Sequence, residues 1–326
     1  MGDGAWDRAL EITDHAGEHL PELVAAALDA AASYVHAARG DRRPVEWYPR
    51  IRQSWRHDGM YAVQSGSAAV EAHGWAGDIA AMLATRTEVV VFLRDLWREG
   101  QLGLEVRLAA VAIGHLATVM PSRSTRERVD LLADAERLAA EASRIWGEGS
   151  TRRPPTLEGR CWIARLDAEL LRARLLAGQE VDGADLIQAW TRAVQLFEER
   201  SEPYEVARSL AGLAQALLAA GTGTGEAADA IERARGIATE LGAAPLLRRI
   251  PTGPVRGPSG PAELTRREQE VLGHLALGRS NGEIGRVLFI STKTVSVHVS
   301  RILAKLDVAS RGEAVAAARA RGLLDP

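Results

Sequence analysis

Lysine is almost missing from this sequence, although 40 of its 326 residues are Lys or Arg. The two lysines are Lys293 and Lys305, so none occurs in the first 292 residues. A P-loop needs a lysine that reaches the β and γ phosphates of a bound nucleotide. Schiff-base catalysis and the ATP site of a protein kinase also need lysine. These chemistries are therefore excluded from most of the chain.

Cysteine and long apolar runs are equally scarce. The single Cys161 excludes an intramolecular disulfide and a cysteine-based zinc site, and it suits a reducing compartment. The start, MGDGAWDRALE, lacks the basic and apolar regions of a signal peptide. No run of about 18 apolar residues predicts a membrane span, because Asp29 and His36 interrupt the segment Leu23–Ala38. We therefore expect a cytoplasmic protein with no membrane partner.

Catalytic motifs are absent as well. His15 and His19 have the i,i+4 spacing of a metal-binding pair on a helix, but no third ligand or H-E-x-x-H motif accompanies them. A solvated helix face is the favoured interpretation. The stretch 257–260 does not complete a G-x-S-x-G nucleophile elbow. The sequence thus predicts no catalytic residues, no metal site and no cofactor, and we expect the protein not to be an enzyme.

Residues 1–250 have the apolar spacing of α-helices. Apolar residues recur every three or four positions, and short Gly, Pro or Ser segments separate the periodic stretches. The β-branched run at 89–91 is also predicted to be helical, because Val89, Leu93, Leu96 and Trp97 would share one face. The eight tryptophans are expected to serve packing rather than to form a binding cage.

The predicted helices come in pairs. One pair is Leu170–Gly178 with Ala189–Phe197, and the next is Leu213–Gly221 with Ala230–Ala234. The glycines that end the first helices are 43 residues apart, longer than the ~34 of a tetratricopeptide repeat. We predict a degenerate, tetratricopeptide-like array of helical hairpins with a concave surface for a ligand or partner. The alternative is a plain helical domain with no groove in use.

Residues 251–261 form a predicted linker. Seven of these eleven residues are Pro or Gly, a composition that excludes helix and central strand. We therefore place a domain boundary here, between residues 1–250 and residues 262–326.

The last segment, 262–326, carries clear helix caps. Capping boxes are formed by Thr265 with Glu268, Ser280 with Glu283, and Ser310 with Glu313, and Ser291 supplies a further cap. Gly278 and Gly322 are natural C-terminal stops. The four helices predicted are Arg266–Leu277, Gly282–Leu288, Thr292–Leu306 and Arg311–Arg321.

Only three residues, 289–291, join the second and third of these helices. So short a turn predicts a helix-turn-helix, with Gly285 allowing close contact. In the third helix an apolar stripe consists of Val295, Val299, Ile302, Leu303 and Leu306, and the opposite face carries Lys293, Ser296, Val297, Ser300, Arg301 and Lys305. Residues 262–326 carry a net charge of +3 and the remainder −6. This balance favours DNA binding over the alternative of a protein-binding helical module.

The string from Leu264 to Leu324 resembles the LuxR-type DNA-binding domain along its full length of about 60 residues. The resemblance rests on LTRRE at the start, GRSNGEI, ISTKTV, His298, KLDV and Arg311. The helical part, through LFEERSEPYEVARSLAGLAQALLAAG and GAAPLL, is similar to the C-terminal helical repeats of large ATP-binding LuxR-type (MalT-like) regulators.

The resemblance implies a role for each matching residue. The third helix would lie in the major groove. Ser296, Val297 and Ser300 would face base edges, and Val297 could touch a thymine methyl group. Phosphates would be held by Lys293, Thr294, Arg301 and Lys305. The last helix resembles the family's dimerisation helix, with Ala314, Val315 and Ala318 on one side.

Two departures from the family pattern are visible. Many members carry a basic residue where Ser296 or Ser300 stands, which affects the base code. The large regulators also carry an N-terminal NTPase module that this chain does not contain, and a receiver domain is not matched either. A natural short relative and a truncated longer protein both fit this absence.

The resulting hypothesis is a cytoplasmic, all-α transcription regulator. Its expected partners are double-stranded promoter DNA, a second copy of the chain on that DNA, RNA polymerase, and an inducer or protein bound to the helical region. The alternative is a helical scaffold for proteins with a weak or vestigial DNA module.

Overall fold

The computed structural model describes residues 5–15, 20–97, 102–150, 156–221, 224–252, 264, 266–288, 292–306, 308, 310–320 and 323–324. The chain divides into two compact units, Met1–Gly253, called the helical unit below, and Pro254–Pro326, called the C-terminal unit. Every regular element in the described residues is a helix, so the predicted all-α class is confirmed. Most of the predicted linker 251–261 lies outside the described residues, and its conformation stays a prediction.

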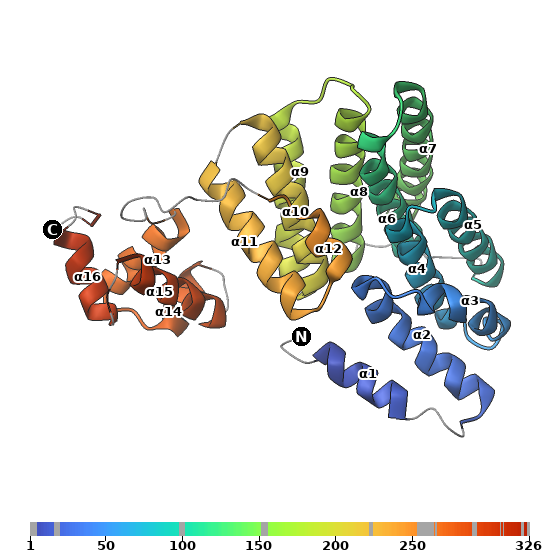
Figure 1. Ribbon diagram of the computed structural model, residues 1–326, viewed down its shortest axis with the longest axis horizontal. Helices are drawn as coiled ribbons and strands as arrows, with labels where there is room; N and C mark the ends of the chain where they lie inside the picture. Colours follow the sequence, from blue (N-terminus) through green and yellow to red (C-terminus); the bar gives the residue numbers. More distant parts are fainter. Residues whose placement is uncertain are drawn as a thin grey trace. The chain divides into compact units, whose positions relative to one another are not determined.

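The helical unit is a succession of antiparallel helices (Figure 1). Its elements are α1 (Ala5–His15), α2 (Glu22–Arg39), α3 (Arg43–Gln53), α4 (Gly59–Ala76), α5 (Ile79–Leu96), α6 (Leu102–Val119), the 3-10 turn η1 (Met120–Ser122), α7 (Thr125–Ser150), α8 (Leu157–Leu176), α9 (Gly183–Glu199), α10 (Pro203–Ala220), α11 (Thr224–Glu240) and α12 (Ala244–Arg249).

The even-numbered helices form one continuous layer. Helix α2 packs on α4, α4 on α6 and α6 on α8, while α3, α7 and α9 each lie against the two helices that flank them in sequence. Helix α10 joins this layer through its side chains, because Arg165 of α8 donates to Ser209 of α10 at 3.1 Å. Alternation of this kind is what stacked helical hairpins produce, since each hairpin buries its apolar stripe against the next.

The last helix of the unit meets the second. Helix α12 packs against α2, and a Cβ on Gly40 would stand 2.7 Å from Cγ of Pro245. Gly40 also has a left-handed φ of 84°, so both the backbone angle and the close approach require glycine there. Near the start of the chain, Trp6 packs on Tyr204 of α10 with ring centroids 5.7 Å apart.

The predicted helix pairs are present as helices. Gly178 and Gly221 follow α8 and α10 with positive φ values of 92° and 66°. Ala193 and Ala234, the predicted points of close helix approach, are both completely buried. The assignment of these pairs to a tetratricopeptide-like repeat stays a prediction.

Two further expectations concern apolar segments. Residues 89–91 belong to helix α5, as predicted, and Val89, Leu93 and Trp97 pack against the core, but Leu96 is exposed. The expectation that no segment is apolar enough to span a membrane needs correction. The window Leu104–Ser122 has the required length and composition, yet 78% of it is buried inside the helical unit. This window covers most of α6, which is a core helix packed between α4, α7 and α8.

The C-terminal unit consists of α13 (Arg266–Ala276), α14 (Asn281–Leu288), α15 (Thr292–Leu306) and α16 (Arg311–Ala320). These bounds agree with the predicted helices to within one residue. Helix α15 is central, because it packs on each of the other three. The buried apolar side chains of the core are Leu264, Val271, Leu272, Leu275, Ile284, Val295, Ile302, Leu306, Ala314 and Ala318, and Glu268 is buried as well.

The caps of this unit are confirmed where they are described. Ser280 Oγ and its backbone N–H both donate to Glu283, at 2.7 and 2.8 Å, and the Glu283 N–H donates back to Ser280 Oγ at 3.3 Å. The Glu313 N–H likewise donates to Ser310 Oγ. Gly278 has a φ of 73°, as expected of a C-terminal stop. The predictions at Thr265, Ser291, Gly322 and His19 lie outside the described residues, as does the side chain of His15.

Candidate nucleic-acid interface

The two helices of the predicted helix-turn-helix are joined by three residues, because α14 ends at Leu288 and α15 begins at Thr292. An arginine from α13 fixes the end of α14: Arg267 donates to the carbonyl oxygen of Leu288 at 2.8 Å. This bond satisfies one of the carbonyl groups that a helix terminus leaves without an intrahelical partner. Gly285 is buried, in agreement with its predicted role at a close contact.

Helix α15 is held by its apolar stripe. Val295 and Ile302 are completely buried, Leu306 nearly so, and Val299 and Leu303 are half-buried against the same core. The stripe predicted from the sequence is therefore confirmed. Because all five side chains point into one small core, the helix cannot rotate about its axis without exposing them. The opposite side is thereby fixed in its orientation.

Ser296 and Ser300 are exposed, as a base-reading role requires. The Ser296 hydroxyl donates to the carbonyl oxygen of Thr292 and accepts from Asn281 Nδ2, both at 3.0 Å. A hydroxyl has one donor and two acceptor sites, so one acceptor site of Ser296 remains. That site suits the amino group of adenine or cytosine. Ser300 forms no hydrogen bond through its hydroxyl among the described residues.

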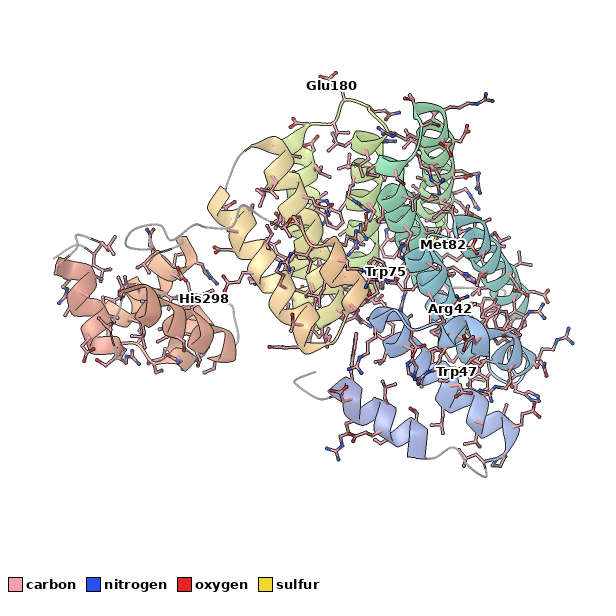
Figure 2. The ribbon with its side chains drawn as sticks, in the orientation of Figure 1. Arg42, Trp47, Trp75, Met82, Glu180 and His298 are labelled. Carbon is pink, nitrogen blue, oxygen red and sulfur yellow. The ribbon has the colours of Figure 1, made fainter. Side chains whose placement is uncertain are left out.

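The remaining predicted interface residues belong to α15 by their backbone. Lys293, Thr294, Val297, Arg301 and Lys305 lie within Thr292–Leu306, but their side chains are outside the described part of the structure. Their roles toward bases and phosphates stay predictions. His298 is half-buried on the same helix (Figure 2).

The predicted dimer contact on α16 is wrong at two of its three residues. Ala314 and Ala318 are completely buried within the unit's own core, so they have no surface to offer a second copy. Val315 is half-buried against that core. Alanine is small enough for either role, and here the need to fill the space beside α13 and α15 decides. The exposed small residues of α16 are Gly312, Ala316 and Ala320 instead.

Sequence reasoning missed Asn281 as an interface residue. It is the first residue of α14 and follows the Ser280 cap, yet its side chain reaches α15 and binds Ser296. The short turn was the available signal, since it forces the two helices close together. Asn281 therefore orients the hydroxyl of Ser296.

Electrostatics near α14 follow from its cap. The hydrogen bonds from the Ser280 side chain and backbone lower the pKa of Glu283 below its usual value. Its carboxylate is therefore charged at neutral pH, and the positive end of the helix dipole favours that charge. Arg286 is exposed in the same unit and is available to an anionic partner. Arg311 is exposed as well, and it donates to the carbonyl oxygen of Arg279.

Comparison with known proteins assigns this unit. Residues 262–318 match the family model described as "Bacterial regulatory proteins, luxR family". The C-terminal unit thus carries a LuxR-family helix-turn-helix domain, as the sequence motifs predicted. No solved structure significantly matches the chain.

Similar curated proteins match over the same region. An uncharacterized transcriptional regulatory protein of Bacillus subtilis, YhcZ, is 60% identical over 52 residues, which are 16% of this chain and 24% of that protein. LiaR, a transcriptional regulatory protein of the same organism, is 47% identical over 62 residues, 19% of this chain and 29% of LiaR. SolR, a transcriptional activator of Ralstonia solanacearum, is 43% identical over 67 residues, 21% and 28% of the two chains. The chain thus spans less than a third of each relative's length.

Proposed function

We propose that this protein is a sequence-specific, DNA-binding transcription regulator. The observation that carries the proposal is the α14–turn–α15 arrangement, in which a buried stripe fixes α15 and leaves Ser296 and Ser300 exposed. The LuxR-family match over 262–318 supports it. An α-helix of this kind fits the major groove of B-DNA, where each base pair presents a distinct pattern of donors and acceptors.

The residues of α15 divide between two tasks in this proposal. Ser296, Val297 and Ser300 contact base edges, while the phosphate contacts come from Lys293, Thr294, Arg301 and Lys305. Phosphate contacts supply affinity and register, and base contacts supply the sequence preference. Asn281 supports the first task by orienting Ser296.

The active form on DNA is a homodimer that reads two half-sites related by a twofold axis. The exposed side of α16 is the proposed contact, in place of Ala314 and Ala318. Gly312, Ala316 and Ala320 recur every four residues on this helix and are exposed, so two copies of α16 can approach closely there.

The helical unit senses or docks a ligand or protein partner and governs the C-terminal unit. The protein works in the cytoplasm, has no catalytic activity, and acts on transcription through RNA polymerase. The action on transcription is supported by the similar proteins, which are named transcriptional regulators.

Selection of the full-length protein against a random duplex pool at about 0.15 M salt tests the proposal. We expect enrichment of an inverted repeat. The same selection on the exposed-face variant Ala316→Arg should enrich single half-sites, because an added charge prevents two copies of α16 from meeting. The matched control is Ala31→Arg, another exposed alanine, on α2 of the helical unit.

If neither the full chain nor residues 262–326 alone enriches any sequence, the proposal is refuted. The alternative, a helical scaffold with a vestigial DNA module, would then stand. Enrichment by the fragment alone would support a regulator whose helical unit masks DNA binding.

A further inference from the structure

The interior of the helical unit holds an unusual number of charges. Three carboxylates, Glu71, Glu169 and Glu205, are buried to more than nine-tenths. Arginines gather around them from three helices: Arg165 and Arg172 on α8, Arg208 on α10, and Arg249 on α12. Charged side chains are almost never buried without partners, because removal from water is costly. Each of these buried carboxylates and guanidinium groups therefore needs a partner of opposite charge or a hydrogen bond.

Three of the four arginines are paired. Glu169 accepts from Arg165 Nη2 and from Arg172 Nε, both at 2.8 Å. Glu71 accepts from Arg208 Nη1 at 2.9 Å. Within the described residues, the side chain of Arg249 forms no hydrogen bond and no ion pair. Its guanidinium carbon lies 5.9 Å from the ring centroid of Trp75.

The surroundings of Arg249 are unfavourable for its charge. Burial, and then the neighbouring guanidinium of Arg172, lower the pKa of Arg249 well below its usual range, although the carboxylate of Glu169 opposes them. A guanidinium nevertheless stays protonated at neutral pH. Glu169 therefore compensates its positive charge only in part, and a bound anion would compensate the rest.

Trp75 is the common neighbour of several polar groups without partners. The His115 ring centroid lies 4.9 Å from that of Trp75, and the guanidinium carbon of Arg208 lies 5.9 Å away. Trp75 Nε1, His115 Nδ1 and Arg208 Nε are buried and have no hydrogen-bond partner within the part of the chain that the structure describes. His115 and Arg208 are only 1% and 4% exposed. Such unsatisfied groups are few in native proteins, and a cluster of them needs an explanation.

These groups define the donors and acceptors that a ligand would meet. His115 Nε2 lies 3.3 Å from a Glu71 carboxylate oxygen, which can only accept, so Nε2 carries the proton. Burial lowers the pKa of His115, although Glu71 opposes this, and the ring is neutral with Nδ1 as an acceptor. Trp75 Nε1 and Arg208 Nε are donors. Trp75 and Arg249 are only half-buried, which leaves solvent access on their side. Figure 2 labels Trp75 beside α12 in this view.

We propose that Trp75, His115, Arg208 and Arg249, called the Trp75 cluster, bind a small organic anion. A carboxylate or phosphate of the ligand pairs with Arg249 and accepts from Arg208 and Trp75, and a hydroxyl or amino group donates to His115. This inference rests on the proposed sensing role of the helical unit, for which it names the chemical class of the ligand.

The position of Arg249 gives such a ligand a route to the rest of the chain. Arg249 is the last residue of α12, the final helix before residue 253, where the helical unit ends. The next two residues, Ile250 and Pro251, are held by α11, because Arg235 donates to their carbonyl oxygens, each at 3.3 Å. An anion that ties Arg249 to α4 and α10 therefore stabilises the seating of α12.

The test titrates the full-length protein with inorganic phosphate and, separately, with succinate, at an ionic strength held constant with sodium chloride. Tryptophan emission is the readout, because Trp75 belongs to the cluster. We expect a saturable change with at least one probe, and the stronger response identifies a phosphate or a carboxylate ligand. Trp75→Phe should remove most of the change in emission.

Two matched variants decide whether Arg249 is responsible. Arg249→Gln should weaken binding about tenfold or more, since it removes a charge-assisted contact. Arg248→Gln makes the same substitution at the neighbouring exposed residue of α12 and should bind as the parent does. Arg249→Gln should fold, because it removes an unpaired charge. If the thermal unfolding midpoint of Arg249→Gln is lower than that of the parent, Arg249→Met is titrated in place of Arg249→Gln.

Absence of a saturable change with either probe, or equal binding by the Arg249 and Arg248 variants, would overturn the inference. A nonspecific salt effect would persist in both variants alike. The titration contains no DNA, and the duplex selection contains neither probe. Failure of anion binding is therefore distinguishable from failure of the proposed DNA-binding function.

Discussion

The helical unit buries many charged side chains, and the C-terminal unit buries almost none among its described residues. Within the described residues, the helical unit buries Glu71, Arg86, Glu105, Arg165, Glu169, Arg172, Glu205 and Arg208, whereas the only buried charged residue of the C-terminal unit is Glu268. The core of the C-terminal unit is otherwise apolar. Most of its described charged residues lie at or near the surface.

Size explains part of this difference. A small domain buries a smaller fraction of its surface and has only a marginal net stability. A buried charge without a good partner can cost several kcal/mol, ~3–5 when one member of a buried pair is lost. A unit of about 70 residues cannot offset many such costs, and its charges stay outside, where phosphates can reach them. The larger helical unit can hold charges inside, where they suit a small ligand.

The largest expected effect is on DNA recognition. Val297→Glu places a carboxylate among base edges and phosphates, so specific binding to the selected duplex should fall by at least about 10³-fold, to the nonspecific level. Fluorescence anisotropy measures this loss. The matched control is Val129→Glu, an equally charged change at an exposed valine of the helical unit. Equal losses in the two variants would mean that charge alone, and not position on α15, governs binding.

The next effect concerns the buried ion pairs. Glu169→Gln leaves Arg165 and Arg172 without their carboxylate, so the free energy of unfolding should fall by about 3 kcal/mol. Urea unfolding followed by tryptophan emission measures it, because all eight tryptophans lie in the helical unit. The control is Glu136→Gln, at the exposed pair with Arg174, which should cost less than about 1 kcal/mol. A loss for Glu169→Gln no larger than the control's would contradict this account.

Acid should weaken the helical unit through the same carboxylate. Although burial alone raises the pKa of Glu169, Arg172 and Arg165 outweigh it and hold that pKa well below its usual value of 4.5. A depressed carboxyl pKa stabilises the fold above 4.5, and that contribution is lost as pH falls toward the folded-state value. We expect the unfolding free energy to decline below about pH 4.5 in the parent. This decline of the unfolding free energy with falling pH should be shallower in Glu169→Gln. Parallel pH profiles of the parent and the variant would show that other titratable groups cause the decline.

A smaller effect is expected at the Ser280 cap. Ser280→Ala removes both hydroxyl bonds of the capping box, and the C-terminal unit should lose about 1 kcal/mol. Circular dichroism records the unfolding of the C-terminal unit, while the unfolding curve followed by tryptophan emission should stay unchanged, because all tryptophans lie in the helical unit. Ser300→Ala, at an exposed serine inside α15, should change stability by less than about 0.5 kcal/mol. A shift in tryptophan emission would mean that the units do not unfold independently.

The smallest effect is a change of slope. Arg301→Ala should reduce the slope of log affinity against log salt by about one, on specific and nonspecific duplexes alike. The control is Arg137→Ala, an exposed arginine of the helical unit, which should leave the slope unchanged. An unchanged slope for Arg301→Ala would remove this residue from the phosphate contacts.

Much of the C-terminal unit could be predicted from the sequence because its signals are local. The Ser280–Glu283 box spans four residues, and the Val295–Leu306 stripe follows from helical periodicity alone. Ala314 and Ala318 were assigned to the wrong surface because alanine has no strong preference between a core and an interface. The bond between Asn281 and Ser296 crosses the turn and leaves no periodic trace.

The interior of the helical unit could not be predicted in the same way. Glu71 binds Arg208, 137 residues further along the chain, and Arg249 meets Trp75 from the other end of the unit. In sequence each of these residues looks like an ordinary polar position on an amphipathic helix. Only the stacking of the even-numbered helices brings them together, and that stacking depends on many distant contacts.

The most direct test of the DNA-binding claim is methylation interference on the selected duplex. Dimethyl sulfate modifies guanine N7 in the major groove and adenine N3 in the minor groove, so one reaction reports on both grooves. If α15 reads base edges in the major groove, methylation of guanine N7 should block binding in both half-sites, while adenine N3 methylation within them should not. Interference confined to adenine N3, or none at either position, would contradict the proposal.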